Sequence, residues 1–234
     1  MRVLASISNL GGVSDSALSA IVGSLRDANF CTLQHTSPRT IARSQDYVLD
    51  HETPYGTAMQ ETHIAKRNGR YHVWSYVNPA ALLNLLARES TQFNDLLWAT
   101  CQSTPPSPDS PWEIIAYEDE VSSGNVLRVD QTRKCGAFYW SFVQFGYEVL
   151  SHVSGWMLGG VIRAKNVKDI SGGLSAVMAF LIQSFFGAEH DFSTGGVQVR
   201  LRQATVTIFA KLSICVADED ALRAIWTVKG FYFN

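Results

Sequence analysis

A proline-rich segment near the middle of the chain constrains the fold most. Residues 102–111 read Gln-Ser-Thr-Pro-Pro-Ser-Pro-Asp-Ser-Pro and hold four of the chain's seven prolines. Proline fixes φ and lacks the backbone donor, so this segment can sustain neither a helix nor a central strand. We therefore expect a linker at 102–111 between an N-terminal domain at 1–101 and a second domain at 112–234.

The composition is that of a folded protein. The 234 residues are 46% hydrophobic and 17% charged, with a net charge of -2, which excludes disorder as the main state. Each half carries a net charge of -1, from 8 basic against 9 acidic residues in 1–110 and 11 against 12 in 111–234. A site for a polyanion such as DNA must therefore be a local cluster.

No segment indicates export or insertion into a membrane. The N-terminus lacks a long apolar core with a cleavage site, and the most apolar stretch, 174–186, is too short to span a bilayer. The four cysteines lie far apart without a C-x-x-C pair, which suits reduced thiols and gives no zinc signature. We expect an intracellular protein without a membrane partner, the nucleus being one candidate location.

The first half is predicted to be mostly helical. Between Ser14 and Asp46, two short helices could form a helix-turn-helix in which Arg39 and Arg43 contact DNA, and an ordinary packed helical pair is the alternative. Asn78-Pro79 begins another helix, with Ala81, Leu82, Leu85 and Leu86 on one face. A turn at 53–56 and a short strand at 71–77 separate these helices.

The second half is predicted to alternate strands and helices. Strands are expected at 113–117, 136–145, 156–163, 197–201 and 205–216, and helices at 174–186 and after Asp218. The last strand is nearly continuously apolar, which is typical of a strand buried on both faces. The fold class is therefore α/β (α+β): an N-terminal helical region, then a mixed sheet with helices whose element order matches a ribonuclease-H-like core.

Two acidic clusters stand where such a core carries its metal ligands. If the strands 113–117 and 205–216 are parallel neighbours, Asp119 and Asp218 come together and can share Mg²⁺, a hard ion that prefers oxygen ligands. Strand alternation places Asp119 on the face of Ile115 and Tyr117, and Glu118 on the other. The alternative is structural: Asp218 caps the following helix, and residues 118–120 form a solvated strand end.

A third carboxylate on a later helix would complete the site, but the sequence ends soon after Gly230. We therefore expect a core that is incomplete at its C-terminus, with weak Mg²⁺ binding and negligible catalysis.

The region after the first acidic cluster carries a resemblance. Residues 117–134 resemble the D-E-V-x-x-G-N-x-L-x-x-D-x-R-K signature of a large multi-copy, mobile-element-like dinoflagellate protein family. Further matches span most of the chain from residue 11, at 53–56, 78–83, 159–173 and 218–230. This family is in turn remotely similar to cut-and-paste transposases of the Plavaka and Zisupton kind. The resemblance implies Asp119 and Asp218 as catalytic acids, although the downstream cysteine pair of those transposases is absent.

Basic and aromatic residues follow the first acidic cluster. Arg133 and Lys134, together with Arg128, Arg163, Lys165 and Lys168, could line a track for nucleic-acid phosphates, or could be solvated loop charges. The aromatic residues of 138–147 could stack on bases, but packing in a strand pair is the better interpretation. The G-x-S-x-G, G-x-G-x-x-G and P-loop patterns are absent, which argues against hydrolase, dinucleotide and NTPase functions.

Three functional hypotheses follow. The chain is a piece of a mobile-element transposase or nuclease, a DNA-binding derivative without catalysis, or a structural globular protein.

Overall fold

The computed structural model describes residues 52–122, 134–187, 191–217 and 219–226. The chain divides into two compact units at 1–52 and 53–234, and the description that follows concerns the second. The predicted helix-turn-helix, with Arg39 and Arg43, lies outside the described residues. The described part combines helices with a mixed six-stranded sheet, which confirms the α/β class.

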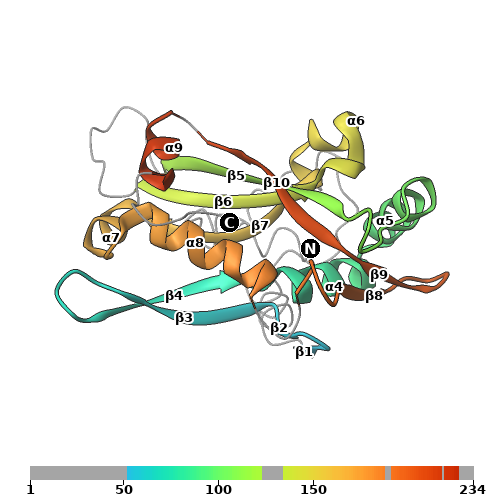
Figure 1. The fold of residues 1–234 in the computed structure, drawn as a ribbon, viewed down its shortest axis with the longest axis horizontal. Coiled ribbons are helices and arrows are strands. Elements are labelled where there is room, and N and C mark those ends of the chain that lie inside the picture. Colours follow the sequence, from blue (N-terminus) through green and yellow to red (C-terminus); the bar gives the residue numbers. More distant parts are fainter. Residues whose placement is uncertain (1–51, 123–133, 188–190, 218, 227–234) are drawn as a thin grey trace, which may run out of the picture. The chain divides into compact units, whose positions relative to one another are not determined.

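The main sheet has the strand order β10–β5–β6–β7–β4–β3 (Figure 1). Its strands are β3 (Met59–Ala65), β4 (Tyr71–Val77), β5 (Trp112–Ser122), β6 (Lys134–Phe142), β7 (Met157–Arg163) and β10 (Ala210–Val216). The pair β5–β10 is parallel, whereas the other neighbours are antiparallel. The strands predicted at 113–117 and 205–216 are therefore neighbours, as expected.

The predicted strand 205–216 is two strands in two sheets. Its first part, β9 (Thr205–Ile208), pairs with β8 (Val197–Arg200), and its second part is β10. The chain changes partner at Phe209, whose carbonyl accepts a hydrogen bond from the Trp112 backbone amide at 2.8 Å. The prediction of burial on both faces was wrong, because β10 is an edge strand with Ile214 and Val216 each 43% exposed.

The helices of the described part lie beside the sheet, and the first two begin at side-chain caps. They are α4 (Pro79–Glu89), α5 (Thr91–Ser103), α6 (Gly146–Leu150), α7 (Ala164–Asp169), α8 (Gly173–Phe186) and α9 (Glu219–Trp226), with single 3₁₀ turns at Val143–Phe145 and Val153–Gly155. Asn78 caps α4 as predicted, since its side chain accepts hydrogen bonds from two backbone amides. Helix α8 packs on one face of the sheet, where Phe185 contacts Trp140 edge to face at 5.0 Å.

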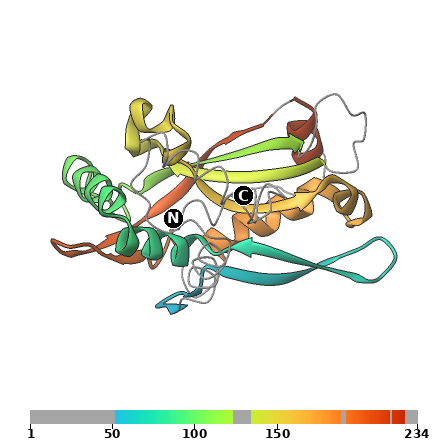
Figure 2. The ribbon, with the colours of Figure 1, turned by 180° about the vertical axis from the view of Figure 1, so that it is seen from behind.

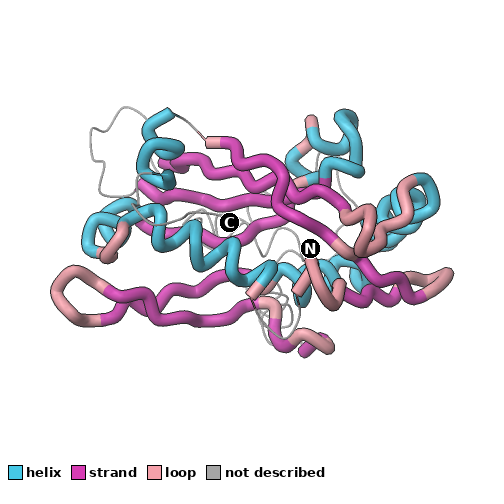
Figure 3. Tube along the Cα trace, in the orientation of Figure 1, coloured by secondary structure: helices cyan, strands magenta, loops and turns pink. Residues whose placement is uncertain are grey.

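Residues 53–101 belong to the same compact unit as the main sheet. A hairpin of β3 and β4 extends the main sheet, joined to β7 at Tyr76 and Gly160 (Figure 3). The buried indole of Trp74 donates a hydrogen bond to the Val161 carbonyl at 3.0 Å. The boundary predicted at 102–111 thus lies inside one compact unit, because the apolar face of β4 is buried against β7 and α8.

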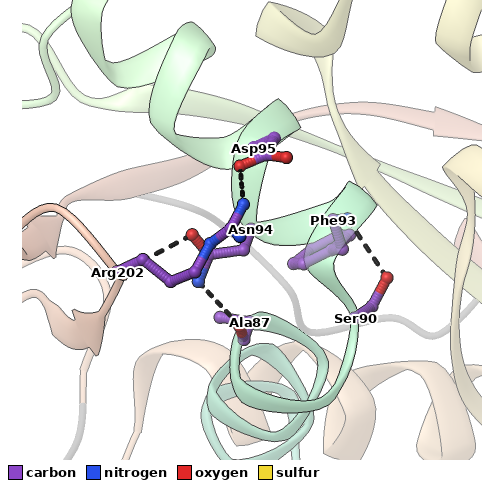
Figure 4. A network of polar contacts seen from close by, with 6 residues as sticks. All are labelled: Ala87, Ser90, Phe93, Asn94, Asp95 and Arg202. Carbon is purple, nitrogen blue, oxygen red and sulfur yellow. Dashed lines mark hydrogen bonds and ion pairs between the residues drawn. The ribbon is translucent and has the colours of Figure 1, made fainter.

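The β8–β9 hairpin lies beside helices α4 and α5 (Figure 2), and a buried amide connects it to them (Figure 4). Asn94, 3% exposed, donates to the Ala87 carbonyl at 2.7 Å and accepts from the Arg202 backbone amide at 3.4 Å. The Arg202 guanidinium also pairs with Asp95. Both ends of the Asn94 amide are satisfied, as a buried polar group requires.

Candidate acidic site at the end of β5

Three consecutive acids, Glu118, Asp119 and Glu120, lie near the C-terminal end of β5, before its last two residues, and their side chains alternate between the two faces of the sheet. Asp119 is exposed and shares a face with Tyr117, whereas Glu118 is only 6% exposed on the opposite face. This alternation confirms the predicted strand phase. Consecutive acids on opposite faces do not combine into one site, so Asp119 is the carboxylate that the C-terminal end of β5 offers to solvent on its face.

Two tyrosines, Tyr117 and Tyr139, lie near Asp119 on its own face. The Tyr117 hydroxyl is hydrogen-bonded to the Asp119 carboxylate. The Tyr117 ring stacks on Tyr139 of β6 with centroids 6.2 Å apart, and its centroid lies 5.8 Å from that of Trp156. Burial, and then the negative charge of Asp119, raise the pKa of both tyrosines. The phenols therefore stay protonated at neutral pH, where the Tyr117 hydroxyl can donate to the carboxylate.

The buried acid, Glu118, occupies space next to Gly136, which has no side chain. A Cβ atom on Gly136 of β6 would lie 3.0 Å from Oε1 of Glu118. The absence of a side chain at Gly136 therefore makes room for the Glu118 carboxylate among apolar neighbours such as Ile162.

The third acid, Glu120, forms an ion pair with Lys134, a residue predicted from the sequence to contact nucleic acid. The Lys134 ammonium lies 2.6 Å from the Glu120 carboxylate. This pairing neutralises Lys134, which makes it a weaker candidate for contacting phosphates than an unpaired cation. Arg133, the other residue predicted there, lies outside the described residues, as does Arg128.

The partner acid, Asp218, also lies outside the described residues, but its strand is described. The parallel register runs from Ala210 beside Trp112 to Val216 beside Tyr117. Asp119 follows Tyr117 by two residues, and Asp218 follows Val216 by two. Among the residues that the structure describes, no group of three His, Cys, Asp or Glu side chains could hold a metal ion. Within the described residues, Asp119 can supply a carboxylate oxygen to Mg²⁺, but no group of three such side chains completes a site around it.

The sequence located Asp119 but not its aromatic neighbours. Tyr139 was assigned to strand packing together with Phe138 and Trp140, which lie in the core on the other face. The period-two pattern of β6 could have separated these residues, but the register that sets Tyr139 beside Tyr117 depends on the connection between β5 and β6.

Comparison with known proteins yields no match among family models, curated proteins or solved structures. Within the described ranges, none of the helices combines the length and the apolar character needed to cross a bilayer.

The contact between Tyr117 and Asp119 is testable by titration. In an Asp119→Asn variant we expect phenolate absorbance to develop at lower pH than in the wild type, because the negative charge that opposes ionisation of Tyr117 and Tyr139 is gone. Ultraviolet absorbance near 295 nm follows this change. The matched control, Asp109→Asn on an exposed loop, should leave the titration unchanged. Superimposable curves for wild type and Asp119→Asn would contradict the arrangement.

Proposed function

We propose that this chain is a ribonuclease-H-like core related to mobile-element transposases, which binds nucleic acid and holds Mg²⁺ weakly at the end of β5. The observation that supports this most is the strand order around β5. Antiparallel β5, β6 and β7 are followed by helices and then by β10, which returns parallel to β5. This is the order expected when two acid-bearing strands must end side by side.

The chemistry available at this strand end explains why catalysis should be negligible. Two-ion phosphodiester cleavage uses ions about 3.5–4 Å apart that contact the attacking and the leaving oxygens. In our proposal Asp119 and Asp218 supply carboxylate oxygens, and water completes the coordination of a bound ion. An ion with so few protein ligands binds weakly and is poorly positioned to activate a nucleophile. The Tyr117 hydroxyl further engages the carboxylate that would coordinate the ion.

Calorimetry and a nicking assay test this proposal together. We expect Mg²⁺ to bind with a dissociation constant on the order of millimolar and Asp119→Asn to abolish that binding, because the carboxylate is the ligand. Nicking of supercoiled plasmid should be no faster with the wild type than with Asp119→Asn. Fast Mg²⁺-dependent nicking that Asp119→Asn abolishes would instead identify an active nuclease. Absence of both cation binding and nucleic-acid binding would favour a structural protein.

A second candidate, nucleic-acid binding without any cation chemistry, is favoured by a separate feature, the concentration of basic residues at one end of the sheet. The two candidates differ in the calorimetry, because the second predicts nucleic-acid binding by a wild type that shows no Mg²⁺ binding dependent on Asp119.

A further inference from the structure

Six basic side chains gather at the end of the sheet where β5 terminates. Three belong to the turn of the β3–β4 hairpin and three to α7 and the residue before it. This basic end consists of Lys66, Arg67, Arg70, Arg163, Lys165 and Lys168. It contains six of the chain's 19 lysines and arginines, although the whole chain is slightly acidic. In Figure 1 the hairpin turn and α7 lie at the same end, on the left.

Backbone hydrogen bonds hold the two parts of the basic end together. The Arg67 amide donates to the Asp169 carbonyl at 2.9 Å, and the Ser171 amide donates to the Ala65 carbonyl, also at 2.9 Å. Lys66 and Ile170 form an isolated antiparallel bridge. The hairpin turn is therefore fixed against the end of α7, so the two groups of cations form one surface.

The cations of the basic end differ from others in the described part of the chain. Arg88, Lys134, Arg202 and Lys211 each pair with a carboxylate. Among the described residues, none of the six cations of the basic end makes such an ion pair, and five of the six are exposed. The adjacent Asp169 offsets one charge. His72 adds none at neutral pH, because burial and then the charge of Lys66 lower its pKa, against the opposing effect of Asp169.

Such a concentration of like charges is unfavourable for folding and is typical of polyanion recognition. Closely spaced, uncompensated cations repel one another, yet they create a local positive potential even on a protein of small net charge. Tyr71, 66% exposed, stands next to Arg70 at the edge of this surface and offers an aromatic ring for contact with a sugar or base.

The register of the sheet connects the basic end to Asp119. Arg163 of β7 is paired with Cys135 of β6, and Cys135 is paired with Val121 of β5. Paired residues point to the same face, so Arg163 shares a face with Val121 and, two residues earlier, Asp119. Adjacent strands lie about 4.8 Å apart, which places the backbone of Arg163 about 10 Å from that of β5.

We propose that the basic end binds the sugar–phosphate backbone of a nucleic acid and directs it across the end of β6 toward Asp119. The route toward Asp119 rests on the function proposed above, whereas the binding itself requires no cation and no catalysis. The hairpin turn supplies half of the contacts.

Fluorescence anisotropy with a labelled DNA duplex of about 20 base pairs, in EDTA and at several KCl concentrations, tests the proposal. In the triple variant Arg70→Ala/Lys165→Ala/Lys168→Ala we expect the slope of log K against log salt to become shallower by about 2–3 units, because each phosphate contact contributes about 0.9. By the same relation, affinity at 0.1 M salt should fall about 100-fold or more.

A matched triple variant separates this site from bulk charge. Arg88→Ala/Arg200→Ala/Lys211→Ala also removes three positive charges, but from α4, β8 and the start of β10, and should change affinity less than about threefold. Because the titration is done in EDTA, it does not depend on Mg²⁺ binding at Asp119, and failure of the cation proposal would leave this measurement valid. Equal losses in the two triple variants, or an unchanged slope in the first, would overturn the proposal. So would tighter binding to phosphatidylserine vesicles than to the duplex.

Discussion

Replacing Trp112 by alanine is expected to lower the free energy of unfolding by about 4 kcal/mol, the usual cost of emptying a tryptophan site in a core. Trp112 is fully buried and packs edge to face on Phe142, with centroids 5.0 Å apart, and on Phe145 at 6.3 Å. Its indole nitrogen also donates to the Thr104 carbonyl at 2.8 Å. The variant loses both the packing and this hydrogen bond.

Urea denaturation measures this loss, and limited proteolysis locates it. Because Trp112 holds the proline-rich segment through Thr104, cleavage between residues 104 and 111 should accelerate in Trp112→Ala. Trp112→Phe retains much of the packing but not the indole donor, so it should cost about 1–2 kcal/mol. Rapid cleavage of this segment in the wild type, at the rate found for Trp112→Ala, would restore the two-domain division predicted from the prolines.

Gly160→Ala should destabilise the protein by about 2–3 kcal/mol through overpacking. A Cβ atom at Gly160 would lie 2.7 Å from Cζ2 of Trp74. That ring cannot move aside easily, because it is 3% exposed and its indole nitrogen is bound to the Val161 carbonyl. Thermal and urea unfolding report the change.

Gly195→Ala is the matched control for this substitution. A Cβ atom there would meet only the Asp191 carbonyl oxygen, at 3.9 Å, so stability should change by less than about 0.5 kcal/mol. Since Gly160 lies where β4 joins β7, Gly160→Ala should also loosen the β3–β4 hairpin. A Gly160→Ala protein as stable as Gly195→Ala would show that β4 does not pack on β7 in this way.

Sequence patterns located most strands and predicted that β5 and β10 are neighbours, but they did not predict the place of the β3–β4 hairpin in the sheet. The strand at 71–77 and the helix beginning at Pro79 were predicted from alternation and capping, which are local signals. Strand β3 was missed, although Asn68-Gly69, with φ of +78° at Gly69, is a strong hairpin turn. Membership of the hairpin in the main sheet depends on the pairing of Tyr76 with Gly160, 84 residues later (160 − 76), and no local pattern encodes that contact.

In the candidate site too, local features could be predicted from the sequence, whereas contacts between distant residues could not. Period-two alternation was enough to place Asp119 and Glu118 on opposite faces, because alternation is a property of a single strand. The nearness of Arg67 to α7 could not be predicted, since the hydrogen bond from its side chain to the Ile170 carbonyl joins residues 103 apart. The basic end therefore becomes visible only when the sheet is assembled.

The parallel pairing of β5 with β10 also has a consequence for the kinetics of folding. β5, β6 and β7 form a meander, and the closest pair between β5 and β6 joins residues 12 apart (134 − 122). By contrast, Trp112 and Ala210 are 98 residues apart (210 − 112). Contacts between distant residues form late, because a long loop must close before they are made. Until β10 arrives, the outer edge of β5 has unpaired backbone groups that can pair with another chain. During synthesis β10 is the last strand of the described sheet to emerge, so a nascent chain exposes this edge until then.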